Sequence, residues 1–133
     1  MQDMTADEIE AMLNEAMIGR LSMADRNGRP YTIPFPFCWA DGALYLRLLL
    51  SGRKGAVLAQ NDQVCFEVDH FTQNLDEYAS VLIEGRLVSV SSIAEKERAM
   101  RKIVIDQISG RRRDSISPTS RVYAPLSRGT FVL

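Results

Sequence analysis

The sequence predicts a small, mainly β domain: an antiparallel β-barrel whose openings are covered by helices. Several short strand-like segments follow one another, and tight turns join most of them, which favours antiparallel pairing. One helical segment comes at the start of the chain and another comes late. A length of 133 residues is that of a single domain, spanning residues 1–133, and is long enough to bury a core.

Residues 4–18 are predicted to form the first helix. Thr5 is a suitable N-cap, and Glu8 stands three residues later, which is the spacing of a capping box. Gly19 is predicted to end the helix. The apolar residues that recur at helical spacing on one face are Ile9, Met12, Leu13 and Ala16.

The next two segments are predicted to form a hairpin, with strands over 20–24 and 30–39. The sequence DRNG between them, residues 25–28, is typical of a hairpin turn. Pro34 and Pro36 lie inside the second strand. Because proline has no N–H for a central ladder, they predict a sheet edge, a bulge or an irregular segment.

The middle of the chain is predicted to hold strands and one short helix. After a turn at Asp41 and Gly42, residues 43–50 are almost continuously apolar, which indicates a strand buried on both faces. Gly85 stands inside a long alternating strand and predicts a bulge or a close backbone approach. The remaining segments are a helix over 55–60, a strand over 64–68, a polar loop over 71–77 and a strand over 79–91.

The last part of the chain is predicted to begin with an amphipathic helix over 92–108, capped by Ser92. A basic, serine-rich loop over 110–119 follows, and then two terminal strands over 121–126 and 130–133. The apolar side of the helix comprises Ile93, Met100, Ile103, Val104 and Ile108.

The composition is that of an ordinary globular protein, with 46% hydrophobic and 25% charged residues. A net charge of −1 provides no general attraction for nucleic acid or an anionic membrane, and neither partner is expected. Cys38 and Cys65 lie in apolar strand-like settings, so we expect buried, reduced thiols rather than a disulfide or a metal site. The N-terminus lacks a signal-peptide core, which favours a cytoplasmic protein.

The clearest chemical signal is the loop Ser51-Gly52-Arg53-Lys54, which follows an apolar strand and opens a short helix. Arginine offers bidentate donors, lysine a point charge, and a helix start adds free N–H groups and a positive dipole end. This combination of groups is suited to holding a phosphate. Taken alone, such a loop is more often a solvated basic turn, and the phosphate-binding interpretation depends on its surroundings in the sequence.

Other polar or aromatic residues favour ordinary structural roles. Arg111, Arg112 and Arg113 have no interleaved aromatics, so a solvated loop is expected rather than a nucleic-acid contact. His70, the only histidine, is expected on a surface loop, and Glu84 and Arg86 are expected to share a face as an ion pair. Tyr31, Phe35, Phe37 and Trp39 alternate along one strand, which indicates core packing or a dimer contact. No Ser-His-Asp spacing, paired-carboxylate motif, P-loop or GxGxxG fingerprint occurs.

The order and spacing of several short motifs resemble the pyridoxamine 5′-phosphate oxidase-like family of FMN-binding split barrels. The resemblance covers residues 5 to 126 and is closest to the nitroimidazole-resistance-like flavoproteins of that family. The motifs that carry it are Gly19-Arg20-Leu21, Gly28-Arg29-Pro30 followed by Pro34, Leu44-Tyr45, Gly52-Arg53-Lys54, Asn61 and Glu84-Gly85-Arg86.

The resemblance implies a six-stranded antiparallel split barrel that acts as a homodimer, with FMN between the subunits. It implies an oxidoreductase that uses a small-molecule substrate and a reduced nicotinamide, NAD(P)H. The phosphate would be held by the loop containing Ser51, Arg53 and Lys54. The flavin ring would lie along the predicted strand over 30–39. The cofactor-binding residues implied beyond the loop are Tyr31, Thr32, Ile33 and Pro34, together with Arg47 and Leu48 on the strand that flanks the ribityl chain.

One pair of residues departs from the family pattern. Arg47-Leu48 stands where the nearest subgroup often has His-Ser or His-Thr, so one phosphate-binding hydroxyl is missing at Leu48. This departure keeps open the alternative of a binding module without flavin chemistry, which would carry a flavin, bind haem or act as a dimeric scaffold. The resemblance leaves a further alternative, a reductase that uses the deazaflavin F420, as related barrels do. The catalytic residues and the substrate are not indicated by the sequence.

Overall fold

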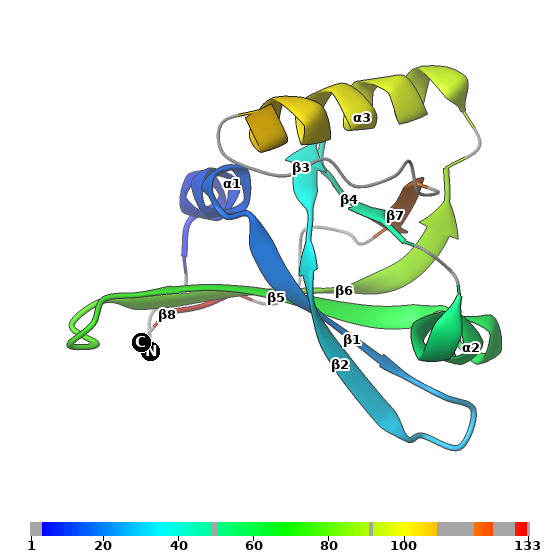
Figure 1. Ribbon diagram of the computed structural model, residues 1–133. Helices are drawn as coiled ribbons and strands as arrows, with labels where there is room; N and C mark the ends of the chain where they lie inside the picture. Colours follow the sequence, from blue (N-terminus) through cyan, green and yellow to red (C-terminus); the bar gives the residue numbers. More distant parts are fainter. Residues whose placement is uncertain (1–3, 49–50, 91, 109–118, 124–129, 133) are drawn as a thin grey trace.

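The computed structural model describes residues 4–48, 51–90, 92–108, 119–123 and 130–132, and shows a twisted antiparallel sheet with helices around it (Figure 1). The strands follow the order β2-β1-β5-β6-β7-β4-β3, and β8 pairs with β6 beside this path. The helices are α1 (Ala6–Glu15), α2 (Gly52–Gln60) and α3 (Ile93–Ile108). The strands are β1 (Ile18–Ala24), β2 (Pro30–Pro36), β3 (Cys38–Ala40), β4 (Ala43–Arg47), β5 (Gln63–Phe71), β6 (Tyr78–Ser89), β7 (Thr119–Tyr123) and β8 (Thr130–Val132).

A single bend joins the two ends of the sheet. The strands β2 and β3 lie at opposite ends of the strand order, yet only Phe37 separates them in the chain. The backbone N–H of Phe37 donates to the carbonyl oxygen of Met17 at 3.3 Å, and its buried ring meets Phe66 edge-on with centroids 5.1 Å apart. The sheet therefore curls into a split barrel around this turning point.

The predicted fold class, a mainly β antiparallel split barrel with flanking helices, is confirmed. The described residues form eight strand segments, because one predicted strand is divided at Phe37 and β8 is a short addition. Counting β2 and β3 as one bent strand and leaving β8 aside gives the six strands expected. Of the three possibilities that Pro34 and Pro36 left open, the structure has the sheet edge, since β2 stands at the end of the strand order and pairs with β1 alone among the described strands.

The first helix is shorter than predicted. The predicted N-cap at Thr5 is present, because the N–H of Glu8 donates to the Thr5 hydroxyl at 3.2 Å. The carboxylate of Glu8 accepts from the Thr5 hydroxyl at 3.1 Å rather than from the backbone N–H that a capping box would use. The helix ends at Glu15, so the prediction that Gly19 ends it is wrong. Gly19 lies within β1, where it is buried.

Gly19 is required by close packing rather than by helix termination. A Cβ atom at this position would collide with the ring of Phe66 and come within 2.6 Å of the carbonyl oxygen of Glu67. The β5 strand crosses β1 at this point, and the ring of Phe66 covers the space that a side chain would fill.

The two predicted turns form as the sequence indicates. Asp25 accepts hydrogen bonds at one carboxylate oxygen from the N–H groups of Asn27 and Arg29, both at 2.9 Å. Asp41 and Gly42 both have positive φ angles, of 51° and 73°, which suits the tight hairpin between β3 and β4.

The core fills the barrel, and two helices are attached to it by polar contacts. Leu13 of α1 is buried in the same cluster as the strand residues. The indole N–H of Trp39 donates to the Glu10 carboxylate of α1 at 2.7 Å, and the hydroxyl of Tyr45 contacts the Glu95 carboxylate of α3 at the same distance. Residues buried essentially completely are Leu21, Leu44, Leu46, Leu48, Phe66 and Val68.

The middle and late segments differ from the predictions in detail. The β5 strand runs on to Phe71, and pairing between β5 and β6 continues through Gly85 opposite Val64 without a bulge. Ser92 caps α3 as predicted, since its hydroxyl accepts the N–H of Glu95 at 3.3 Å. Ile93 was expected on the apolar side of α3, but its side chain is 75% exposed because it lies in the first turn, beyond the barrel.

Some predicted features fall outside the described parts of the chain. They are the whole of the basic loop over 110–118 and the side chains of Met100, Ile103, Val104 and Ile108. Among the described residues, no helix has both the length and the apolar character that crossing a membrane requires.

Candidate functional site

The loop predicted to hold a phosphate is the beginning of α2, three residues earlier than the predicted helix start. Ser51 is the N-cap, in extended conformation, and its hydroxyl makes no capping hydrogen bond to the helix. Gly52 has a φ of +78°, which lets the chain turn sharply from the strand into the helix. Arg53 and Lys54 therefore lie in the first turn, where the backbone N–H groups have no partners within the helix.

Both cations of this turn lie over aromatic rings of β2. The guanidinium carbon of Arg53 is 4.4 Å from the centroid of the Tyr31 ring. The ammonium of Lys54 is 5.6 Å from the centroid of the Phe35 ring. Both distances are within the range of a cation–π interaction. We call these four residues the cation–aromatic cluster.

The electrostatics of the cluster favour an anion. The positive end of the helix dipole and two adjacent cations meet at one place, and the first turn of α2 contains no acidic residue. In the part of the chain that the structure describes, neither cation forms an ion pair. Arg53 is exposed and Lys54 is half-buried, so both charged groups can reach a ligand from solvent.

The other predicted cofactor-binding residues divide between two faces of β2. Tyr31 and Ile33 point inward with Phe35, half-buried against the core. Thr32 and Pro34 are exposed on the opposite face, where the Thr32 hydroxyl lies 2.9 Å from that of Ser22. The structure therefore brings Tyr31 and Ile33 to the cation–aromatic cluster, but not the side chains of Thr32 and Pro34.

The two predicted residues at the end of β4 are placed differently from each other. Arg47 is the last residue of β4 and is half-buried, opposite Thr119 in the register with β7. Leu48 is fully buried and belongs to the hydrophobic core. Its side chain therefore faces away from any ligand, and only backbone groups remain at this position for cofactor contact.

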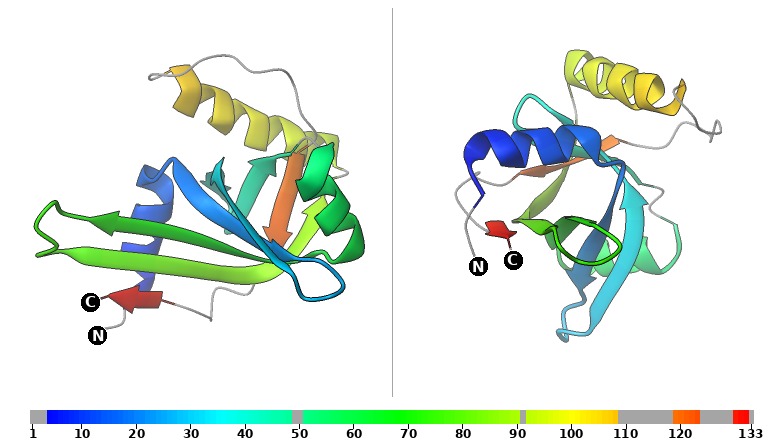
Figure 2. Two further views of the ribbon diagram at one scale, coloured as in Figure 1. Left: turned by 60° about the horizontal axis from the view of Figure 1, so that its bottom comes forward. Right: turned by 90° about the vertical axis from the view of Figure 1, so that its left-hand side faces the viewer.

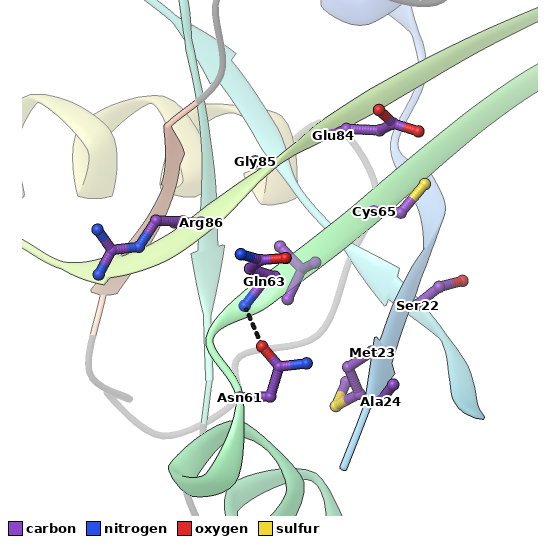
Figure 3. Close-up of a pocket in the computed structure, with 10 residues that line it drawn as sticks. Ser22, Met23, Ala24, Asn61, Gln63, Cys65, Glu84, Gly85 and Arg86 are labelled. Atoms are coloured by element: carbon purple, nitrogen blue, oxygen red, sulfur yellow. Dashed lines mark hydrogen bonds between the residues drawn. The ribbon is translucent and has the colours of Figure 1, made fainter. Parts of the chain in front are cut away.

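A concave region separate from the cation–aromatic cluster lies at the other end of α2, on the outer face of the sheet (Figure 3). It is an open groove of about 730 Å³. Asn61, the C-cap of α2, accepts the N–H of Gln63 at 3.1 Å beside it. The polar residues that line the groove are Ser22, Asn61, Gln63, Cys65, Glu84 and Arg86.

Sequence reasoning missed two features of this arrangement. Asn61 and Glu84 were recognised as motif residues without a shared location, and Phe35 was assigned to core packing or a dimer contact. The period-two alternation of strands contained a signal for both, since it places Tyr31 with Phe35 on one face of β2. Pairing between β1, β5 and β6 then aligns Ser22, Cys65 and Glu84 on the outer face.

The other polar residues of the sequence lie outside the cluster. His70 is exposed on β5 near the free end of the β5–β6 hairpin, which points away from α2 (Figures 1 and 2). The predicted ion pair between Glu84 and Arg86 is wrong, because Arg86 pairs instead with Asp62 at 2.8 Å. The hydrogen bond and charge of Arg86 lower the pKa of Asp62 below its ordinary value of 3.8.

Cys65 is half-buried in the groove rather than fully buried as predicted, while Cys38 is buried. Burial raises the pKa of the Cys65 thiol above its ordinary value of 9.0, and the nearby carboxylates of Glu84 and Glu67 raise it further. The thiol is therefore neutral near pH 7 and a poor nucleophile.

Alkylation should reveal this raised pKa. We expect iodoacetamide to modify Cys65 slowly at about pH 7, with a rate that still increases above about pH 9, because only the thiolate reacts. Glu84→Gln should speed the reaction at a fixed pH, whereas Glu97→Gln on exposed α3 should not. Peptide mapping by mass spectrometry separates Cys65 from Cys38, and a rate already constant by neutral pH would contradict the assignment.

Comparisons with known proteins give one family. The family model described as pyridoxamine 5′-phosphate oxidase matches residues 5–126. A search of curated protein sequences finds no match.

Solved structures of similar fold bind different ligands according to their names. An FAD-binding protein from Mesorhizobium loti has a TM-score of 0.73 at 21% identity, covering 93% of this chain and 92% of the other. A protein from Bacteroides thetaiotaomicron named for 5-nitroimidazole antibiotic resistance has a TM-score of 0.73 at 20% identity, covering 95% and 82%. The haem storage protein HutZ from Vibrio cholerae has a TM-score of 0.70 at 18% identity, covering 96% and 93%. At these identities the likeness establishes the fold alone.

Proposed function

The chain belongs to the pyridoxamine 5′-phosphate oxidase family, and on that premise we propose that it is an FMN-binding oxidoreductase of the cytoplasm. The observation that carries the proposal is the cation–aromatic cluster at the start of α2. It combines two cations with an inward-facing aromatic strand in a chain whose family is named for a phosphate-containing substrate.

The residues of the cluster fit the chemistry of FMN. Arg53 and Lys54 can neutralise a phosphate monoester, and the unpaired N–H groups of the first helical turn add hydrogen bonds to its oxygens. Ser51, whose hydroxyl is not used as a cap, is available as a further donor. Tyr31, Ile33 and Phe35 are half-buried beside the cations, and the part of their apolar surface that stays exposed is the wall that a flat heteroaromatic ring would contact.

A bound flavin would supply electron transfer between a donor, which we expect to be a reduced nicotinamide, and a small organic acceptor. The contribution of this chain is then to bind and orient. Neither cation is engaged by a carboxylate of the described residues, so their charge is available to the ligand. The only histidine, His70, lies at the far end of β5, which is consistent with a site that leaves the chemistry to its cofactor.

The proposal includes a homodimer. Several large apolar side chains are exposed on different elements, and association with a second copy would remove some of them from water. Sedimentation at micromolar concentration should give the mass of two chains, and a monomer would contradict the dimer. The exposed large apolar residues are Met17, Ile18, Phe71, Leu75, Val88 and Ile93.

The absorbance spectrum of the freshly purified protein tests the cofactor assignment. We expect the two visible bands of an oxidised flavin, and heat release followed by chromatography should identify FMN rather than FAD or a deazaflavin. A Soret band would favour haem, the ligand in the name of the Vibrio cholerae protein. A colourless protein that takes up no added FMN would contradict the proposal.

Oxidoreductase activity needs a separate test, because a flavin carrier would give the same spectrum. The bound flavin should be reduced anaerobically by NADH or NADPH, and the reoxidation rate should then be compared for oxygen and for small organic acceptors. Faster reoxidation by one of these acceptors supports catalysis. Reoxidation by oxygen alone favours the binding-module alternative.

A further inference from the structure

We propose that Tyr31 is a positioning residue for Arg53: its ring holds the guanidinium in the ligand-free protein with the N–H edge available to a phosphate. The inference rests on the proposed function, since it concerns how the same site prepares for its anion. It assigns to Tyr31 a role distinct from contact with a flavin ring.

The first argument is geometric. Tyr31 and Arg53 come from different elements, the edge strand β2 and the first turn of α2, and their side chains meet at 4.4 Å. The ring of Tyr31 is itself fixed, because it packs against the hydrophobic core. A guanidinium resting on this ring is held by a part of the barrel that does not depend on the ligand.

The second argument is electrostatic. Two neighbouring cations at the positive end of a helix repel one another and the helix dipole, and in solution their long side chains would move apart. The structure places each of them over the negative face of a different ring, Tyr31 for Arg53 and Phe35 for Lys54. Tyr31 and Phe35 are four residues apart on one face of an extended strand, so the rings also keep the two charges separated.

The third argument concerns the donors of Arg53. The contact with the Tyr31 ring is made by the guanidinium carbon of Arg53, while the N–H donors of a guanidinium lie at the edge of its plane. Arg53 is exposed, and in the described part of the chain its N–H groups form no hydrogen bond or ion pair with a protein group. The interaction with Tyr31 therefore orders the side chain without consuming the donors, which lowers the entropy lost when a phosphate binds.

Lys54 provides an internal comparison. Its ammonium is 5.6 Å from the Phe35 centroid, close to the outer limit of a cation–π contact, and an ammonium has no flat face to stack. Phe35 should therefore contribute less to phosphate binding than Tyr31 does, although both rings are half-buried on the same strand.

The experiment compares FMN with riboflavin, which has the same ring system but no phosphate. Fluorescence titration of the wild type, Tyr31→Phe, Tyr31→Leu and Phe35→Leu gives the ratio of the two dissociation constants. We expect Tyr31→Leu to reduce the preference for FMN by about three- to tenfold, the scale of one cation–π interaction. Tyr31→Phe should retain the preference, and Phe35→Leu should reduce it less. If Tyr31 only contacted the flavin ring, Tyr31→Leu would weaken both ligands equally and leave the ratio unchanged, which would overturn the inference.

A measurement without ligand completes the test. In the NMR spectrum of the flavin-free protein, the ring current of Tyr31 should shift the Nε–H signal of Arg53 from its ordinary position. The shift should persist in Tyr31→Phe and disappear in Tyr31→Leu. An unshifted signal in the wild type would overturn the inference even if FMN binds tightly. If instead the wild type binds neither flavin, the proposed function fails, and with it the role in phosphate binding.

Discussion

Replacing Arg53 and Lys54 together by alanine is expected to weaken FMN binding about a hundredfold or more, while riboflavin binding changes by less than about threefold. Each charge-assisted hydrogen bond to a phosphate contributes about 1.5–3 kcal/mol, so the loss of two such donors corresponds to at least this factor. Arg53 and Lys54 are the cations in the first turn of α2, and the described residues provide no other charge there.

The expected selectivity follows from how the two ligands differ. Riboflavin has no phosphate, so it can use the apolar wall formed by Tyr31, Ile33 and Phe35 but not the cations. In the double variant, FMN should therefore lose most of its advantage over riboflavin and keep only what the backbone N–H groups and Ser51 provide. Titration of the flavin-free proteins by fluorescence gives both dissociation constants.

A matched control separates local from general charge effects. Lys96 and Arg101 are exposed on α3 and also comprise one lysine and one arginine, so Lys96→Ala/Arg101→Ala changes the net charge by the same amount. This variant should bind FMN as the wild type does. Unchanged FMN affinity in the Arg53→Ala/Lys54→Ala protein would show that the phosphate is held elsewhere.

The elements of the fold could be predicted because their signals are local. Hydrogen bonds and φ angles within a few residues determine the N-cap at Thr5 and the turns at 25–28 and at Asp41-Gly42. The prolines of β2 likewise predict an edge strand, a bulge or an irregular segment without knowledge of the pairing, and the structure has the edge strand. The prolines left an irregular segment open, but the sequence could not show that the strand would turn at Phe37, whose ring packs against Phe66 of a strand distant in the sequence.

The candidate site was predictable in its residue types and only partly in its geometry. Arg53 and Lys54 could be selected because two cations at a helix start have a specific chemistry. Their pairing with Tyr31 and Phe35 depends on how α2 packs against the barrel, which no local pattern encodes. The same limit applies to Leu48, whose apolar side chain is used by the core although its position in the sequence is beside the phosphate loop.

Gly19 illustrates how a local signal can point to the wrong cause. A glycine after a helical pattern usually marks a C-terminal cap, so the sequence predicts that Gly19 ends the first helix. In the structure Gly19 lies in β1 beneath the ring of Phe66, which in turn packs edge-on against Phe37 at the bend of the barrel. The absence of a side chain therefore serves the contact between distant segments, and substitution should affect the whole barrel.

Gly19→Ala is accordingly expected to destabilise the protein by about 3 kcal/mol or more, the upper range for overpacking a core. The new methyl group would meet the Phe66 ring and, at 2.6 Å, the backbone carbonyl oxygen of Glu67, and the carbonyl cannot move without disturbing the pairing of β1 with β5. Urea unfolding followed by circular dichroism measures the change. Gly28→Ala is the matched control: its φ of +78° makes alanine unfavourable by about 1–2 kcal/mol, but a Cβ there would meet no atom within 4 Å. If the Gly19 variant loses no more stability than the Gly28 variant, conformational preference alone explains both glycines and the close approach of Phe66 to β1 is not a constraint on the fold.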